Sequence, residues 1–425
     1  MTYRTQWWVG FLLMGLAIAA GAAWLTTSRG GSDKKTTGHA SLAPPTFDEA
    51  IQEASNYLAS HCDERGRFTY LVNLDPKIHV VPQYNIIRHA GAVHALALSQ
   101  RRHPNAETRK ALLRAAGFLR RAAVGPVPGE TDMITVWSTP EIDGQSSPTD
   151  SKLGGAGLGL AALASVEQVV PGTASLEELR GLGRFLTFMQ KRDGSFYYAY
   201  EPGSVGRNNF GQCLYYPGEA ALGLMMLYEM DPQPIWLEAA ARAMAYLARL
   251  RRGDDVVEPD HWALLATARL WPVCDRCNPP LPREMLLEHA KQICRRMLDD
   301  RPDWSKETVR WGCLTHDGRT CPTATRVEGL AAALTFLPDE EAALREEIRR
   351  AVGPAVEFLR RSQIRQGPCR GGIPGVVARD KPWAGLLEKP GETTEIRVDY
   401  VQHALGGMIE WEKRVGQAVP DNSNP

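Results

Sequence analysis

The amino-acid sequence predicts an all-α fold in which six helical hairpins close into a ring, and three observations support this prediction. Segments with apolar residues at three- and four-residue spacing follow one another from residue 46 to residue 415, with no convincing β-rich region between them. These segments alternate between helices rich in glycine and alanine and helices with a charged face. The connections alternate as well, because mostly short ones follow the Gly/Ala-rich helices and mostly long ones precede them.

The start of the chain differs in kind from the rest. From Trp7 to Leu25 there is no charged residue, and this run of about 19 residues approaches the ~20 that cross a bilayer as a helix. We therefore expect residues 1–27 to form a signal anchor or transmembrane helix, with the body of the protein on the extracytoplasmic face, in the periplasm or at the cell surface. A cleaved signal peptide is the alternative, because Ala20-Gly21-Ala22 offers a small-x-small site.

Composition bounds the remaining organisation. Residues 28–45 are rich in Gly, Ser, Thr and Pro and are expected to form a flexible linker. One helical domain is expected over residues 46–416, followed by a disordered tail at 417–425. The chain has 49 Lys+Arg and 49 Asp+Glu residues, so its formal net charge is +0. Because nucleic-acid binders carry a basic excess, no nucleic-acid partner is expected.

Twelve helices are expected, near residues 46–61, 85–101, 105–123, 152–170, 174–191, 216–230, 235–251, 259–271, 283–299, 323–336, 340–363 and 397–415. The second helix and every other helix after it is rich in small residues, as in GAVHALAL and GGAGLGLAALA. Glycine inside a helix costs about 1 kcal/mol relative to alanine, so its repetition indicates close packing in an inner layer. Partners such as SLEELRGLGRFLTFMQKR carry a charged face and are expected to lie outside.

The long connections precede the inner helices, at residues 62–84, 124–151, 192–215, 300–322 and 364–396. Long ordered loops are uncommon in compact domains unless they have a role, so this end of the ring is the predicted functional face. In a ring, the inner-helix starts would meet in one axial pocket. Paired carboxylates there could divide acid and base roles, and aromatic faces beside them suit a sugar ring.

Polar and aromatic side chains concentrate at these helix starts. The candidate catalytic residues are Glu219, Asp260, Glu328, Asp399 and His261. The candidate substrate-binding residues are Asn85, Arg88, His89, Tyr216, Trp262, Arg326, Arg397, Tyr400 and His403. For any single carboxylate, helix capping or a structural ion pair is the alternative. Their number, and the aromatic or histidine residues beside most of them, favour a functional interpretation of the set.

Other residues with potential chemistry are assigned to the fold instead. His94, within GAVHALAL, is interpreted as a hydrogen-bonded core histidine, and Met225 and Met226 as core filling. His89, His261 and His403 are conceivable zinc ligands, but the sequence has no HxxH or HExxH spacing. Neither a metal nor a cofactor is therefore predicted.

The eight cysteines raise the question of disulfides, which are the default in an exported protein. A helix of about 17 residues is about 25 Å long, too far for a bridge between the two ends of the ring. In the predicted arrangement of helices and loops, five cysteines lie at the functional end: Cys62, Cys213, Cys313, Cys321 and Cys369. Cys274 and Cys277 lie at the other end. Cys313–Cys321 is the predicted pair. For Cys274 and Cys277 the alternatives are a disulfide with each other, a disulfide with Cys294, and free thiols.

Four segments carry a resemblance to a known superfamily: LYYPGEAALGLMMLYE, PDHWALLA, TATRVEGLAAAL and RVDYVQHALGGMIEWE. Together with the alternation of helices over about 46–415, they resemble the six-hairpin, (α/α)6-toroid superfamily of carbohydrate-active enzymes and bacterial toroid proteins without a settled substrate. The resemblance implies an (α/α)6 toroid and a polysaccharide or oligosaccharide substrate. It does not imply one reaction, because the superfamily contains glycosidases, polysaccharide lyases and sugar epimerases.

Hydrolysis of an envelope or extracellular polysaccharide is the reaction expected, with carboxyl groups roughly 6.5–9.5 Å apart for an inverting enzyme. The alternative is a lyase or uronate epimerase, in which His or Tyr removes a proton beside a carboxylate neutralised by Asn or Arg. A non-catalytic glycan-binding or assembly module is a third possibility. Isoprenoid cyclases also form toroids, but the Asp-x-Asp-Asp acid that some of them use has no match in this sequence.

Overall fold

A computed structural model of the protein describes residues 44–144, 149–306, 308–378 and 391–415. The predicted membrane anchor at 1–27, nearly all of the linker at 28–45 and the tail at 417–425 lie outside these residues. Among the described helices, none combines the length and the apolar character needed to cross a bilayer.

All twelve predicted helices are present, with ends within a few residues of the expected ones. The inner helices are α2 (Ile86–Arg102), α5 (Leu153–Val169), α7 (Tyr216–Met230), α9 (His261–Leu270), α11 (Thr320–Ala333) and α13 (Val398–Val415). The outer helices are α1 (Phe47–Ser60), α3 (Ala106–Phe118), α6 (Leu176–Phe188), α8 (Pro234–Arg251), α10 (Arg283–Asp299) and α12 (Ala342–Arg361). Helix α11 begins three residues earlier than expected, because Pro322 is tolerated in a first turn, where its missing N–H would have no helical partner.

Shorter elements complete the chain. They are the π-helical turn η1 (Leu119–Ala123), α4 (Pro140–Asp143) and the 3₁₀ turns η2 (Trp271–Arg276) and η3 (Asp339–Glu341). The strands are β1 (Leu71–Asn73), β2 (Val124–Pro126), β3 (Ile134–Val136), β4 (Ser151–Lys152), β5 (Ala199–Glu201), β6 (Gly206–Asn208) and β7 (Glu395–Arg397).

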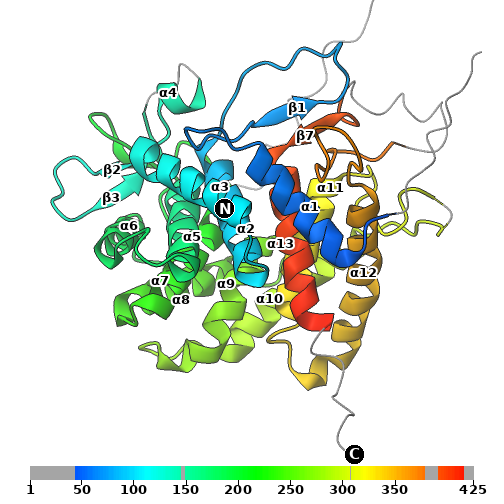
Figure 1. The fold of residues 1–425 in the computed structure, drawn as a ribbon. Helices are drawn as coiled ribbons and strands as arrows, with labels where there is room; N and C mark the ends of the chain where they lie inside the picture. Colours follow the sequence, from blue (N-terminus) through cyan, green and yellow to red (C-terminus); the bar gives the residue numbers. More distant parts are fainter. Residues whose placement is uncertain (1–43, 145–148, 307, 379–390, 416–425) are drawn as a thin grey trace, which may run out of the picture. The chain divides into compact units, whose positions relative to one another are not determined.

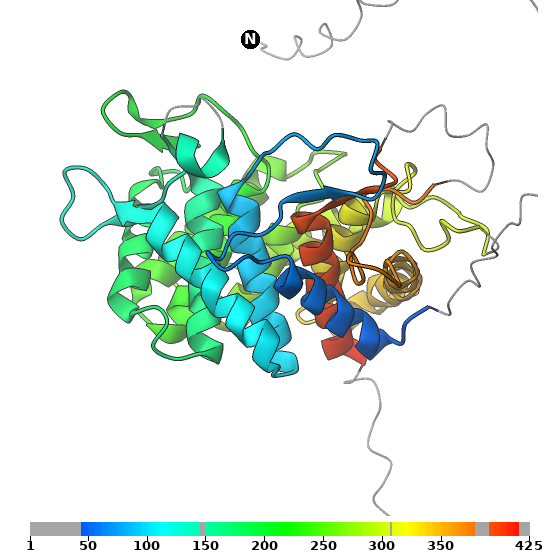
Figure 2. The ribbon, with the colours of Figure 1, turned by 45° about the horizontal axis from the view of Figure 1, so that its top comes forward.

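The inner helices close into a ring. Each packs against the next in the order α2, α5, α7, α9, α11, α13, and α13 packs back against α2. The outer helices cover this ring (Figures 1 and 2), and each of them contacts the inner helix that follows it in the chain. The described residues therefore form the predicted all-α (α/α)6 toroid.

Glycine allows the inner helices to approach each other as closely as predicted. A Cβ atom added to Gly157 of α5 would lie 2.7 Å from the backbone nitrogen of Ala220 in α7. A Cβ atom added to Gly223 of α7 would lie 2.5 Å from the carbonyl oxygen of Gly157. Real Cβ atoms do not come this near to backbone, so at this crossing the two helices meet with no side chain between them.

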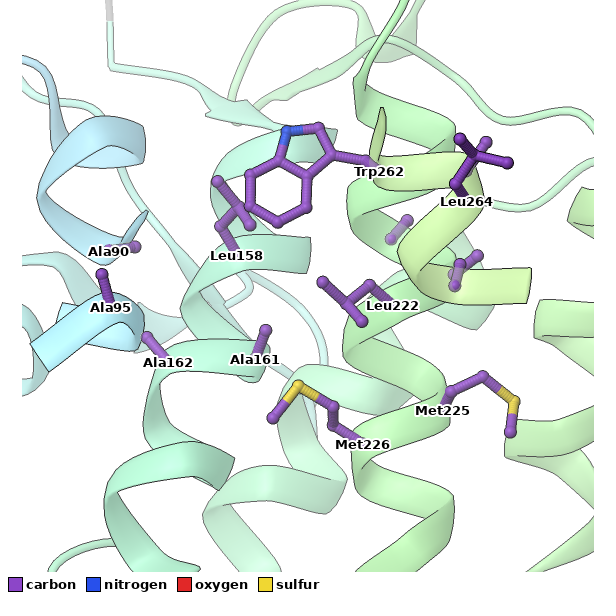
Figure 3. Close-up of a cluster of buried hydrophobic side chains, with 14 of the residues drawn as sticks. Ala90, Ala95, Leu158, Ala161, Ala162, Leu222, Met225, Met226, Trp262 and Leu264 are labelled. Carbon is purple, nitrogen blue, oxygen red and sulfur yellow. The ribbon is translucent and has the colours of Figure 1, made fainter. Parts of the chain in front are cut away.

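The interior of the ring is apolar below the helix starts. Figure 3 shows side chains of α2, α5, α7 and α9 in one cluster that includes Leu158, Leu222 and Trp262. Met225 and Met226 fill this core as predicted, and both are buried. The predicted assignment of His94 is also confirmed, because its Nδ1 lies 2.7 Å from the hydroxyl of Ser165 inside the ring.

Small β-ribbons hold the starts of the inner helices in place. Strand β1, before α2, pairs antiparallel with β7, before α13, with Val72 opposite Ile396 (Figure 1). In the same way β4, before α5, pairs with β5 in the loop before α7, with Ser151 opposite Tyr200. Strand β6 extends this sheet next to β5, and β2 pairs with β3. The first and last hairpins of the ring are thus tied together at the end where the long loops lie.

The predicted Cys313–Cys321 disulfide is absent, and all eight cysteines are free thiols. The thiol of Cys313 lies 3.3 Å from the hydroxyl of Thr323, on the loop side of α11. Cys321 instead lines the cavity at the helix starts. Because Cys321 is in the first turn of α11 rather than in a loop, the helix fixes its direction away from Cys313. Cys274 and Cys277, for which several states were open, are free as well.

We expect Gly157→Ala to destabilise the protein by about 1–3 kcal/mol, because the added methyl group overpacks the α5–α7 crossing. Gly155 of the same helix is the matched control. A Cβ atom there would meet its nearest neighbour, Cγ1 of Ile87, at an ordinary 3.6 Å. Gly155→Ala should therefore be neutral or stabilise by up to about 1 kcal/mol through helix propensity. Chemical denaturation of the full-length protein measures both, and equal effects would contradict the close crossing.

Candidate active site

The starts of the inner helices surround a cavity of about 330 Å³. Its lining comes from all six of them, and it includes ten of the fourteen predicted site residues: Asn85, Arg88, Tyr216, Glu219, His261, Trp262, Arg326, Arg397, Asp399 and His403. Ligand sites in proteins commonly range from about 300 to 1,000 Å³, so this cavity has room for a small molecule.

Two histidines and a carboxylate meet on one side of this cavity. Nδ1 of His403 in α13 lies 2.8 Å from Oε2 of Glu328 in α11. Nε2 of His261, the first residue of α9, lies 3.8 Å from the same oxygen. The imidazole rings of His261 and His403 are 5.2 Å apart between centroids, at an angle of 80°. Three inner helices that are far apart in the sequence thus contribute one cluster.

Hydrogen bonding sets the roles of the two imidazoles apart. Burial raises the pKa of Glu328, and the neighbouring His403 opposes this rise. When Glu328 is ionised, its Oε2 accepts a hydrogen bond from Nδ1 of His403, and Nε2 of His403 faces away from Glu328. His261 is 1% exposed, and neither of its ring nitrogens has a hydrogen-bond partner among the described residues. An unpaired buried polar group costs about 1–3 kcal/mol. Burial, and then the nearby His403 and Arg326, lower the pKa of His261, so its ring is neutral at pH 7.

A fourth ionisable group, Glu219, lies in the first turn of α7. Burial, and then the charge of Asp260, raise its pKa to about 8, so it is largely a neutral acid at pH 7. Its Oε2 atom has no hydrogen-bond partner among the described residues. Space for the carboxyl group comes from Gly154 of α5, where a Cβ atom would lie 2.2 Å from Oε2. Gly406 of α13 leaves room for Glu328 in the same way.

Two arginines hold the carboxylate of Asp399 at the start of α13. Nε and Nη2 of Arg397 lie 2.6 and 3.0 Å from Oδ1 and Oδ2. Nε of Arg88, from α2, lies 3.0 Å from Oδ2. The phenol of Tyr70 bonds to the other side of Arg88. Asp399 is thus fully occupied in orienting two guanidinium groups.

Aromatic rings frame the cavity. Tyr216 stacks on Tyr198 of the preceding loop, with ring centroids 5.3 Å apart. Trp262 lies against both histidines, 4.7 Å from His261 and 5.9 Å from His403. Tyr215 meets His261 edge-on at 5.3 Å. These rings provide apolar faces beside ionisable groups.

Four predicted site residues do not line the cavity, and three of them make contacts elsewhere in the fold. Asp260 is the N-cap of α9, accepting from the nitrogen of Ala263, and it pairs with the buried Arg251 at 2.8 Å. His89 faces outward, with Nε2 3.0 Å from the carbonyl oxygen of Ala115 in α3. Tyr400 donates to Glu395 of strand β7, which leads to α13. For Asp260, the sequence left helix capping or a structural ion pair as the alternative to a catalytic role, and the structure shows both contacts.

Glu328 is not among the lining residues but lies directly behind His403. The cavity also contains eight residues that were not selected from the sequence: Ile87, Leu158, Cys213, Tyr215, Cys321, Pro322, Thr325 and Gln402. Tyr215 carried a signal, since it stands next to Tyr216 at a helix start, and Cys213 and Cys321 were expected at this end of the ring. Tyr198 and Tyr70 come from loops without a periodic pattern, and nothing in their local sequence places them near the axis.

The ligand atoms of His261, Glu328 and His403 lie within 4.8 Å of one another, so this group has the donor set of a divalent metal site. Tetrahedral zinc with bonds of about 2.0–2.1 Å would hold its ligand atoms about 3.4 Å apart. The 2.8 Å between His403 and Glu328 is instead a hydrogen-bond distance. The arrangement as it stands therefore fits a hydrogen-bonded acid–base pair better than a metal site.

Comparisons with known proteins establish the fold. No protein-family model matches the chain, and no curated protein sequence matches it. A D-mannose isomerase is similar in structure, with a TM-score of 0.61 and 13% identity over 87% of this chain and 97% of that one. So is a cellobiose 2-epimerase from Bacillus thermoamylovorans, with a TM-score of 0.60 and 13% identity over 87% and 99%. An α-mannanase from Bacteroides thetaiotaomicron has a TM-score of 0.58 and 11% identity over 88% and 98%.

We expect the stability of the protein relative to Glu219→Gln to fall as pH rises from the ordinary pKa of 4.5 to about 8. The folded state binds the proton more tightly than the unfolded state, so stability is lost across this window, by a few kcal/mol in order of magnitude. Denaturant unfolding of both proteins at the two ends of the window measures it. Glu107→Gln, on the exposed face of α3, should show no such loss. A constant difference between wild type and Glu219→Gln would contradict the raised pKa.

Proposed function

We propose that this six-hairpin toroid protein is a sugar epimerase or isomerase in which His261 and His403 transfer a proton to and from carbon. The observation that carries the proposal is the cluster of two imidazoles around Glu328, open to a cavity of small-molecule size. The sequence led us to expect hydrolysis, with an epimerase as an alternative, and the proposal adopts that alternative. The reason is that the groups brought together at the axis are mainly imidazoles, not two free carboxylates.

The chemistry follows from the environments of the two histidines. In an open-chain sugar, the C2 proton is acidic because it lies beside the C1 carbonyl group. Neutral His261 can remove this proton, which leaves an enediolate. His403 can carry a proton, because the carboxylate of Glu328 stabilises its imidazolium form. Delivery to the opposite face of C2 gives the epimer, and delivery to C1, with transfer of the O2 proton to O1, gives the ketose.

Neighbouring groups suit the charge that develops in this reaction. The enediolate places negative charge on oxygen, and preorganised donors stabilise such an oxyanion strongly in a site that excludes water. The neutral carboxyl group of Glu219 lines the same cavity and can donate a hydrogen bond to this oxygen. The similar structures include a D-mannose isomerase and a cellobiose 2-epimerase, which adds support of the kind that a shared fold can give.

Glycoside hydrolysis is the second candidate, favoured by one observation. Glu219 is kept neutral by burial, as a general acid that protonates a leaving oxygen must be. A partner base is harder to find, because Asp399 is held by two arginines and Glu328 by His403. An α-mannanase is among the similar structures. Hydrolysis would require Glu219, whereas epimerisation would require both histidines.

We expect the full-length protein to exchange the C2 proton of a reducing sugar in heavy water, as followed by proton NMR on D-mannose, D-glucose and cellobiose. His261→Gln and His403→Gln should each slow this exchange by about 10²–10⁴-fold, the usual contribution of a general acid or base. His103→Asn, at the exposed C-terminal end of α2, is the matched control and should leave the rate unchanged.

Two results would contradict the proposal. One is exchange that survives both histidine substitutions. The other is release of new reducing ends from a neutral polysaccharide, lost in Glu219→Gln but kept in His403→Gln, which would assign hydrolysis instead. Retained glycan binding without either reaction would support a non-catalytic module.

We further propose that the protein works on the extracytoplasmic side of a membrane, held there by residues 1–27. The support is the uncharged run from Trp7 to Leu25 and the Gly/Ser/Pro-rich residues after it. A reporter enzyme that needs disulfides for activity, joined to the C-terminus, should be active. Deletion of residues 2–27 should abolish that activity, and an active reporter without them would contradict the proposed location.

A further inference from the structure

We infer that the sugar bound in this cavity carries a carboxylate group, as a uronate does, and that Arg88 and Arg397 bind it. This inference rests on the proposed function and names its class of substrate. Both guanidinium groups line the cavity, and they come from opposite ends of the chain, at the starts of α2 and α13. The β1–β7 ribbon joins those two segments just before the helices begin.

Among the described residues, the charges around the cavity leave one positive charge without a counterion. Arg88 and Arg397 share the single carboxylate of Asp399. Arg326 has its own partner in Asp300, at 2.8 Å. Burial raises the pKa of Glu328, so the hydrogen-bonded Glu328–His403 pair is counted with one titratable proton and adds no net charge. Glu219 is largely neutral at pH 7. One carboxylate on the ligand would therefore balance the two-arginine group, whereas a neutral sugar would leave the excess charge in place.

The arginines also have donors to spare. Nε of Arg88 is directed at Asp399 and Nη1 at Tyr70, which leaves Nη2 without a partner among the described residues. Nε and Nη2 of Arg397 both go to Asp399, which leaves Nη1. A guanidinium group matches a carboxylate in plane and spacing. Asp399 thus fixes both groups while one Nη of each stays available to a ligand.

The helix starts favour the same ligand charge. Six inner helices direct their N-terminal ends at the cavity, and each end bears a partial positive charge. Asn85 caps α2, with Oδ1 3.0 and 3.1 Å from the nitrogens of Ile87 and Arg88. A monoanion fits the single excess charge better than a dianionic phosphate. The six converging N-termini strengthen binding of either anion relative to a neutral sugar.

The test compares D-glucuronate with D-glucose, which differ only in the oxidation of C6, by isothermal titration calorimetry on the full-length protein. Glucuronate should bind at least tenfold more tightly. Arg88→Met and Arg397→Met should each weaken glucuronate binding by about ten- to a hundredfold, the range of a lost charge-assisted hydrogen bond, and change glucose binding little. Arg295→Met, on outer helix α10, is the matched control and should bind like wild type.

A second measurement needs no variant. Glucuronate affinity of the wild type should fall as salt rises to about 0.5 M, while glucose affinity stays constant, because salt screens the charge contact. Equal affinity for the two sugars, or glucuronate binding that neither arginine substitution nor salt weakens, would overturn the inference. The His403→Gln variant distinguishes a failure of this inference from a failure of the proposed function. That variant should keep glucuronate binding and lose C2 exchange, whereas a protein that exchanges glucose but does not prefer glucuronate would keep the function and lose the inference.

Discussion

The structure depends on the close approach of six inner helices. A ring of helices leaves little room at its axis, so the crossing positions must be small, and at Gly157 and Gly223 the backbones of α5 and α7 touch. The same small residues create the site. Gly154 and Gly406 leave the spaces that the carboxyl groups of Glu219 and Glu328 fill. Glycine therefore serves both packing and chemistry, because a glycine on one helix leaves space in the interior for a polar side chain of the neighbouring helix.

Closure of the ring then gathers charge at one end. All six inner helices begin there, and hairpin connectivity sends every long loop to that face. Burial destabilises the ionised forms of these groups, and the site avoids unpaired buried charge in three ways. Glu219 stays protonated, His261 stays neutral, and Asp399 and Glu328 are matched by arginines and by His403. The result is a set of groups whose proton affinities are pushed apart, which is the condition for dividing acid and base roles.

The candidate site shows how far sequence reasoning reaches. Glu219 and Asp260 looked equivalent, as acidic residues at inner-helix starts. Successive residues of a helix turn by about 100°, so one position decides whether a side chain meets the axis or the outer layer. Glu219 is the fourth residue of α7 and lines the cavity, while Asp260 precedes α9 and pairs with Arg251 of the outer helix α8. Arg88 and His89 differ in the same way, one facing the cavity and the other α3.

By itself, the sequence determined the all-α ring, its twelve helices, the alternation of inner and outer layers and the end at which the long loops and the candidate site residues gather. These follow from periodicity, small residues and loop lengths, which are local properties. The tertiary structure decided which polar residues face the axis, that His261, Glu328 and His403 form one group, and that Cys313 and Cys321 stay apart. Those outcomes depend on the rotation of each helix about its own axis. Packing against neighbours far away in the sequence fixes that rotation, and no local pattern records it.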